Sequence, residues 1–159
     1  PAAPPHNPSR WAMRTSYDTA ANFMAMHFEK DSMHSRPLED GTIAWSAVSA
    51  ANAISATVIH DPQKQRVYSA TLGVSLAPDA PQQKLDENLH LIETFLHDFA
   101  PAMKDPNVRT SRALQQLANQ DPSERIVLLS DDSKITIWNN AGLYSLKIES
   151  IANDFDNGH

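Results

Sequence analysis

The stretch QQKLDENLHLIETFLHDFA, residues 82–100, predicts the longest helix of the chain. Its apolar residues recur at spacings of three and four, which places them on one stripe of a helix. The stripe consists of Leu85, Leu89, Ile92, Leu96 and Phe99, with Leu91 and Phe95 beside it. Pro101 ends the pattern, because a proline ring clashes with the carbonyl four residues before it. A second, shorter helix is expected next, with Asp105 as its cap and Pro106 in its first turn.

Strands are expected on both sides of these helices. Upstream, residues 54–60 and 66–77 predict a hairpin, because apolar residues alternate with small polar ones in the second segment. Downstream, residues 126–129, 134–138 and 143–149 predict a three-stranded meander with turn sequences between the strands. Residues 126–129 are apolar on both faces, which is typical of a central strand.

Two further segments complete the fold prediction. We expect a helix over residues 16–30 with Ser16 as its cap, although residues 23–28 also alternate as in a strand. The period of residues 42–52 fits either a strand or a helix, and we expect a strand. Strands and helices are segregated along the chain, which predicts a single α+β domain over residues 11–151. Its antiparallel sheet, the hairpin plus the C-terminal meander, carries one long and one or two shorter helices on one face.

The ends of the chain differ in composition from this domain. Four of the first eight residues are proline, so we expect residues 1–10 to be a proline-rich tether and residues 152–159 a flexible tail. No run of 18 apolar residues is present, so no transmembrane segment is expected. The proline-rich opening and the absence of cysteine favour a bacterial exported protein, periplasmic or tethered to a membrane by a lipid upstream of residue 1. A cytoplasmic domain is the alternative.

The composition excludes several kinds of chemistry. The chain of 159 residues has no cysteine and four glycines, which excludes disulfides, thiol nucleophiles, Cys-ligated zinc and a glycine-rich phosphate loop. With 13 Lys+Arg against 19 Asp+Glu, its net charge of −6 argues against nucleic acid or anionic membrane as the partner. No GxSxG or SxxK motif marks a serine nucleophile. No catalytic residue and no cofactor are therefore predicted.

One flank of the long helix carries a candidate metal site. His90, Glu93 and His97 lie three and four residues apart, so their side chains can reach a common point together with Asp86. Two imidazoles and a carboxylate form a ligand set of zinc and iron sites. The same pattern is also typical of the solvated face of an amphipathic helix, and no HExxH motif accompanies it.

Two tryptophans and three arginines are the candidates for partner binding. If Ile135 and Ile137 face the core, Trp138 lies on the opposite face of the sheet, where tryptophan often anchors a partner. The alternative is that the N-terminal segment, which includes Trp11, covers that face. Arg109, Arg112 and Arg125 could hold an acidic partner, or they could lie over Asp105, Asp121 and Glu124.

These observations favour a non-catalytic exported protein that binds another protein. Such a protein could be a lipoprotein-like accessory protein, an assembly factor or an immunity-type inhibitor, acting through a sheet face or edge and acidic loops. The net charge favours a basic partner. The first alternative is a small-ligand or metal-binding domain that uses His90, Glu93 and His97. The second is a hydrolase or isomerase whose active site carries no sequence motif.

Overall fold

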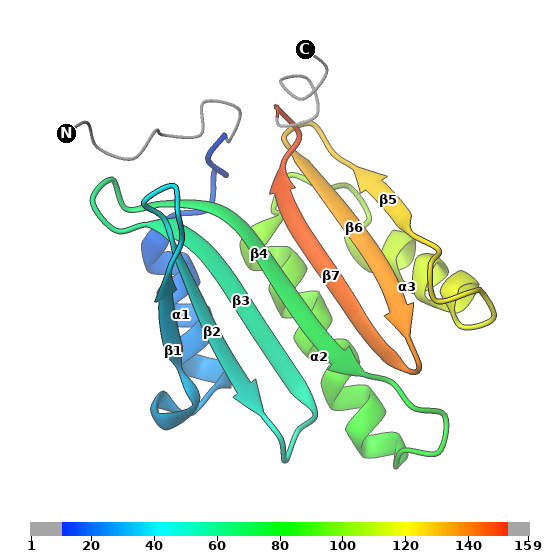
Figure 1. The fold of residues 1–159 in the computed structure, drawn as a ribbon. Coiled ribbons are helices and arrows are strands. Elements are labelled where there is room, and N and C mark those ends of the chain that lie inside the picture. The colour runs from blue at the N-terminus through cyan, green and yellow to red at the C-terminus, as the bar shows by residue number, and fades with distance from the viewer. Residues whose placement is uncertain (1–10, 153–159) are drawn as a thin grey trace.

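A computed structural model describes residues 11–152 and confirms a single-domain α+β fold (Figure 1). The proposed tether over residues 1–10 and all but the first residue of the proposed tail lie outside the described residues. The elements are α1 (Tyr17–His27), a short 3-10 helix η1 (Lys30–Ser32), β1 (His34–Pro37), β2 (Ile43–Ser49), β3 (Ile54–Asp61), β4 (Arg66–Ser75), α2 (Gln82–Phe99), α3 (Pro106–Leu117), β5 (Ile126–Leu129), β6 (Ser133–Asn140) and β7 (Leu143–Ser150).

The strands form one sheet of seven in the order β1-β2-β3-β4-β7-β6-β5. Every neighbouring pair is antiparallel. The two helices α2 and α3 connect β4 to β5, and the meander then returns so that β7 pairs with β4. This return places β1 and β5 at the two edges of the sheet.

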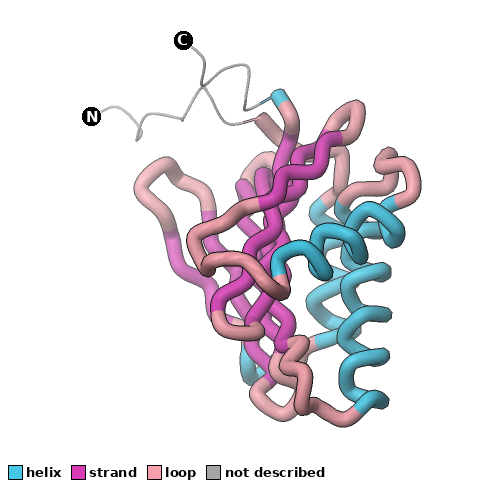
Figure 2. The backbone as a smooth tube through the Cα atoms, turned by 90° about the vertical axis from the view of Figure 1, so that its right-hand side faces the viewer, coloured by secondary structure: helices cyan, strands magenta, loops and turns pink. Residues whose placement is uncertain are grey.

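All three α-helices lie on the same side of the sheet, so the molecule has two layers (Figure 2). Register explains why, because one row across the sheet joins Ala56, Leu72, Leu146 and Ile137 on the same face. Each of these side chains is buried. Apolar residues of the other strands follow the same alternation, so a single face of the sheet requires cover. No helix of the described residues lies over the opposite face, which we call the open face (Figure 1).

Three phenylalanine rings connect α1 to α2 within the helical layer. The Phe23 ring of α1 lies 5.6 Å from the Phe95 ring and 5.5 Å from the Phe99 ring of α2. The Phe95 and Phe99 rings are 5.0 Å apart, one turn from each other along α2. All three are buried, and such tilted and edge-on arrangements are the favoured ones for aromatic pairs.

The ambiguous N-terminal segments are now assigned. The prediction of a helix after Ser16 is confirmed, because the Ser16 hydroxyl accepts the Thr19 N–H at 3.1 Å as a cap. The prediction of a strand within residues 42–52 is confirmed by β2. The sequence prediction missed β1, whose four residues are polar or proline and too few to show a period.

Three details of the helices differ from the prediction. Asp105 does not cap α3 with its side chain, because its own φ of 49° is left-handed. In α2 the buried stripe is rotated so that Leu89 is exposed. Asn88 is buried instead, and its Nδ2 donates to the Ser75 carbonyl at 2.8 Å at the end of β4. This hydrogen bond satisfies the amide, which makes a polar residue acceptable on that side of the helix.

The position of β5 also differs from the prediction. Residues 126–129 form the edge strand of the sheet and not a central strand. Ile126 and Leu128 face the helices, whereas Val127 and Leu129 lie on the open face and are exposed. The apolar residues on both faces of this segment therefore belong to an edge strand whose open-face side chains are uncovered.

None of the helices within residues 11–152 has the length and apolar character needed to cross a lipid bilayer.

The aromatic contacts predict a stability change. We expect Phe95→Ala to lower the free energy of unfolding by about 3–5 kcal/mol, because the large cavity would be bordered by rigid neighbours. Urea unfolding followed by circular dichroism measures this loss. Leu89→Ala, at an exposed position of the same helix, is the control and should cost much less. Equal losses for the two variants would contradict the assigned core.

Candidate functional site

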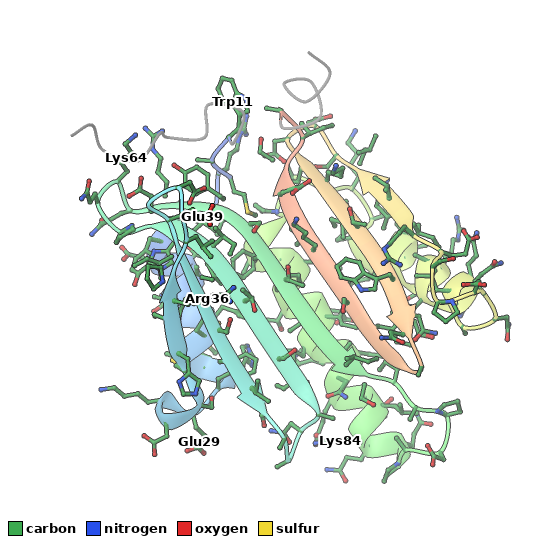
Figure 3. All side chains as sticks on the ribbon, viewed as in Figure 1. Trp11, Glu29, Arg36, Glu39, Lys64 and Lys84 are labelled. Atoms are coloured by element: carbon green, nitrogen blue, oxygen red, sulfur yellow. The ribbon has the colours of Figure 1, made fainter. Side chains whose placement is uncertain are left out.

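The open face consists mostly of small hydroxyl side chains. Register places Ser46, Thr57, Ser69, Thr71, Thr136 and Ser145 on it. These residues are partly exposed, and the hydroxyls of Ser46 and Thr57 on adjacent strands are 3.0 Å apart. Figure 3 shows this face toward the viewer, with Arg36 at the β1 side. Short side chains leave the surface flat between β2 and β7.

One end of the open face, over β5, β6 and β7, is apolar instead. Trp138 lies there because Ile135 and Ile137, its neighbours along β6, are fully buried on the helix side, as the sequence predicted. Val127 and Leu129 are 49% and 48% exposed on β5, and Leu143 is 45% exposed on β7. We call Val127, Leu129, Trp138 and Leu143 the apolar patch. In the register, Val127 and Leu143 are diagonal neighbours of Trp138, whereas Leu129 lies further along β5, level with Lys134. Exposed apolar side chains beside a tryptophan on an uncovered face are typical of an interaction site.

An arginine covers part of the tryptophan ring. Arg125 immediately precedes β5 and continues the row of Val127 and Leu129 on the open face. Its guanidinium carbon lies 5.0 Å from the centre of the Trp138 ring. A cation at this distance over an indole is attracted by the ring electrons. The same guanidinium donates to the carbonyls of Pro122 and Glu124, both at 3.1 Å, which holds it beside the ring.

The charged residues next to the apolar patch are mainly basic. Lys134 of β6 and Lys147 of β7 both pair with Glu149, at 3.1 Å and 3.5 Å. One carboxylate thus serves two ammonium groups, and Arg125 adds a third cation. This end of the open face therefore differs in sign from the chain as a whole, whose net charge is −6.

The edge of β5 leaves main-chain groups pointing outward. Ser130 N–H donates to the Ser133 carbonyl at 2.9 Å, so these two residues form a hydrogen-bonded pair at the end of the β5–β6 hairpin. Hydrogen-bonded pairs alternate along an antiparallel ladder, which makes Leu128–Ile135 and Ile126–Ile137 the next ones. The main-chain groups of Val127 and Leu129 consequently face away from β6.

Arg109 lies beside this edge. Arg109 of α3 donates from Nη2 to the outward Leu129 carbonyl at 3.0 Å. Arg112 lies one turn further along α3 on the same flank and is exposed. Within residues 11–152, neither these two arginines nor Arg125 forms an ion pair with an acidic side chain. The alternative that they lie over Asp105, Asp121 and Glu124 therefore gains no ion pair in this part of the chain.

Trp11 belongs to a different part of the molecule. Two residues after it, Met13 N–H donates to the Val67 carbonyl at 2.7 Å, so the described N-terminal segment runs beside the start of β4 (Figure 3). Trp138 is level with Gly73, which is six residues further along β4. Six residues of strand span roughly 20 Å. The described part of the N-terminal segment therefore does not cover Trp138.

The two histidines of the predicted metal site each lie near a different carboxylate. His90 Nδ1 lies 3.8 Å from Glu93 Oε2, and His97 Nδ1 lies 3.4 Å from Asp98 Oδ1. The two imidazoles are 80% and 87% exposed. In the described part of the chain, no group of three or more His, Asp or Glu side chains is arranged to hold a metal ion. Metal binding at this flank stays a prediction that the geometry does not strengthen.

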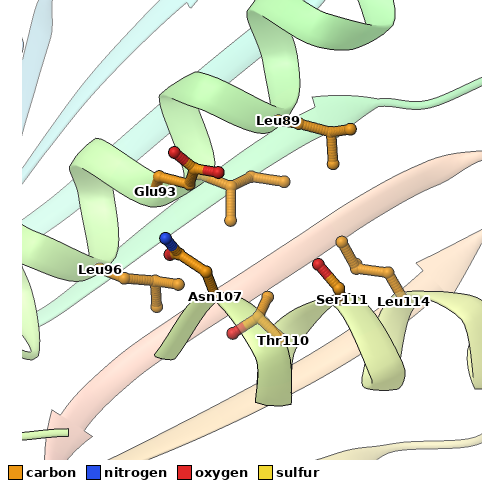
Figure 4. Close-up of a pocket in the computed structure, with 8 residues that line it drawn as sticks. Leu89, Glu93, Leu96, Asn107, Thr110, Ser111 and Leu114 are labelled. Carbon is orange, nitrogen blue, oxygen red and sulfur yellow. The ribbon is translucent and has the colours of Figure 1, made fainter. Parts of the chain in front are cut away.

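Two hollows border α2. A cleft of about 70 Å³ between α2 and α3 has Leu89, Leu96 and Leu114 on its walls and Glu93 and Ser111 at its rim (Figure 4). It holds about two water molecules and is too small for an organic ligand. A larger hollow of about 290 Å³ lies between α1, α2 and the β2–β3 turn. Its polar lining consists of His27, Asn52, Glu87, Asn88 and His90.

His60 and His27 each bury a ring nitrogen. His60 is buried against the rings of Tyr17 and Trp45, at 5.0 Å and 6.2 Å. Burial lowers the pKa of His60, an effect that the nearby Asp61 opposes. Burial likewise lowers the pKa of His27, which Asp98 opposes and His90 reinforces. Among the described residues, His60 Nδ1 and His27 Nε2 are buried without a hydrogen-bond partner, which favours neutral imidazoles.

Comparison with protein-family models, curated proteins and solved structures finds no significant match to this chain. The candidate site therefore stands on its geometry alone.

The buried imidazoles predict a pH dependence of stability. The unfolded chain takes up protons at His27 and His60 near pH 6.5, whereas the folded chain resists them because both pKa values are lowered. Stability should therefore be complete above pH 6.5 and should fall as the pH drops toward 5. Melting temperatures measured from pH 7.5 to 5 test this. His60→Phe should lessen the decline, whereas His97→Ala at an exposed position should not; an unchanged decline in His60→Phe would refute the assignment.

Proposed function

We propose that this chain is a non-catalytic protein-binding module that recognises its partner through the apolar patch and the adjoining edge of β5. The observation that carries this proposal is the exposure of Val127 and Leu143 beside Trp138, and of Leu129 further along β5, on a face that no helix of residues 11–152 covers. A two-layer domain normally hides such residues or uses them. Here the helix side holds the core, so these residues are not needed for it.

The chemistry of the patch supports recognition. Tryptophan and arginine are the residue types that most often dominate binding energy at protein interfaces, and Trp138 and Arg125 stand together at 5.0 Å. Around them, Ser145 and Thr136 supply short hydroxyls that a partner can contact without ordering long side chains. The site thus has an aromatic centre and a polar surround, as interfaces commonly do.

The module would act as an exported accessory protein. An exported accessory role, lipoprotein-like or as an assembly factor or immunity-type inhibitor, is consistent with a cysteine-free composition. A module of this kind needs one specific surface and no catalytic group.

A second candidate function is small-ligand binding in the hollow between α1, α2 and the β2–β3 turn. The observation in its favour is that His27, Asn52, Asn88 and His90 border one space of about 290 Å³. Two of them are already engaged, because Lys84 Nζ donates to Asn52 Oδ1 at 2.7 Å and Asn88 bonds to β4. Native mass spectrometry of the purified chain tests this candidate by detecting a retained ligand, which the protein-binding proposal does not predict.

The test of the proposed function compares a variant of the apolar patch with a variant of an exposed apolar residue elsewhere. The double variant Val127→Ser/Trp138→Ser removes the centre of the patch, and Met26→Ser removes an exposed apolar side chain from α1 on the helix side. Each chain is immobilised, and proteins retained from the native source are identified by mass spectrometry. We expect a protein that binds the unchanged chain and Met26→Ser, and whose Kd for the double variant is weakened at least about 30-fold, the effect of losing a 2 kcal/mol anchor.

Circular dichroism and melting temperature confirm that each variant is folded before binding is compared. Capture of the same proteins by the double variant, with unchanged affinity, would refute the proposal. So would a purified partner whose binding is lost in Met26→Ser and kept in the double variant.

A further inference from the structure

We propose that the partner presents an extended acidic segment, which adds a strand to the free edge of β5 and pairs its carboxylates with Arg109, Arg112 and Arg125. This inference rests on the proposed function and names the chemistry of the partner. It follows from three observations: the outward main-chain groups of β5, the arginines along that edge, and the contrast with the edge at β1.

The first observation is that β5 offers donors and an acceptor to a further strand. The amides of Val127 and Leu129 point away from β6, and within the described residues no acceptor lies within hydrogen-bond distance of either. The outward carbonyl of Leu129 is already held by Arg109 at 3.0 Å. An added strand would therefore pair first through Val127, and Arg109 would stand at the end of the paired segment.

The second observation concerns which charges line this edge. Arg109 of α3 reaches the outward Leu129 carbonyl on the helix side, Arg125 immediately precedes the strand on the open-face side, and Arg112 is exposed one turn along α3 from Arg109. No acidic residue lies within β5, whereas Asp121 and Glu124 precede it and Asp131 and Asp132 follow it. A segment with carboxylates in its middle matches this arrangement, although the chain has a net charge of −6.

The alternation of a β-strand then specifies the pattern of the segment. Side chains on one side of the added strand would continue the apolar patch beside Val127 and Leu129. Those on the other side would meet Arg109 and Arg112 on α3. An alternation of apolar and acidic residues is therefore expected, because main-chain bonds supply affinity in such complexes and alternate side chains supply specificity.

The third observation is that the opposite edge is closed to pairing. β1 has four residues, all polar or proline, and ends at Pro37, which has no N–H. Short strands, polar side chains and proline are the usual ways in which sheet edges avoid extra strands. β5 is equally short but carries exposed Val127 and Leu129 and no proline. Only this edge combines outward amides with apolar side chains in the described sheet.

A second copy of the chain fits the edge less well. Pairing β5 with β5 about a two-fold axis would bring the three arginines of one copy against those of the other. Like charges across an interface oppose association. A partner with carboxylates replaces this repulsion with attraction, so we assign the edge to an acidic segment of another protein.

The test uses a displayed library of random 12-residue peptides selected on the immobilised full chain. We expect the selected peptides to be rich in Asp and Glu alternating with apolar residues, and to bind less tightly at high salt. Val127→Pro removes the outward N–H and leaves the bonds to β6 intact, so it should weaken binding about tenfold, the effect of one lost hydrogen bond with its neighbours. Val127→Thr keeps the N–H and the branched shape and changes only the side chain, so it should weaken binding less than Val127→Pro does.

Matched controls separate the edge and the charge from general effects. Ser35→Pro places proline at an outward position of β1, and Lys30→Glu reverses an exposed charge far from β5. Both should bind normally, whereas Arg112→Glu should weaken binding about tenfold, as expected for a lost charge-assisted contact. Selection of basic or patternless peptides, failure to select any peptide, or equal binding to Val127→Pro would overturn the inference.

Two outcomes separate this inference from the proposed function. If a captured partner needs Trp138 but is indifferent to Val127→Pro and Arg112→Glu, the patch binds protein and the added strand is refuted. If neither change affects any partner, both proposals fail. A concentration-dependent dimer in analytical ultracentrifugation that Val127→Pro dissociates would assign the edge to a second copy, and would also overturn the acidic segment.

Discussion

Most apolar side chains of the central strands point to one face of the sheet, and the rest of the molecule depends on this alternation. The buried row from Ala56 to Ile137 gives α1, α2 and α3 a single surface to cover. The contacts among Phe23, Phe95 and Phe99 then join two of the helices above that surface. With every helix used on one side, the other side of the sheet meets its surroundings directly, and what lies there is available for recognition.

Much of the two-layer architecture could be predicted because it is local. The alternation within residues 66–77, the stripe of α2 and the turn residues of the meander each need only a short window of sequence. The place of Trp138 on the open face followed from its neighbours Ile135 and Ile137 in the same way. Four residues of β1 give no such pattern, and a buried Asn88 could not be foreseen, because its partner is the Ser75 carbonyl of another element.

The role of β5 could not be predicted, because it depends on strand order. An apolar sequence on both sides is typical of a central strand, and Ile126–Leu129 fits that description. Because β7 returns to pair with β4, β5 lies at the edge of the sheet. The sequence of residues 126–129 does not indicate this edge position. The sequence did identify Arg109 and Arg112 as partner-binding candidates. It also offered carboxylate neighbours for them, but no ion pair joins them to those acidic residues within residues 11–152, and Arg109 bonds instead to the Leu129 carbonyl.

The central claim is that β5 is a free edge, and native-state amide hydrogen exchange measured by NMR tests it most directly. Val127 and Leu129 should exchange fast, whereas Leu128 and Ser130, whose amides bond to β6, should be protected. This alternation follows from the ladder that begins with the Ser130–Ser133 bond at 2.9 Å. Equal protection of all four amides in the isolated chain would show that another segment already covers the edge, and would contradict the account.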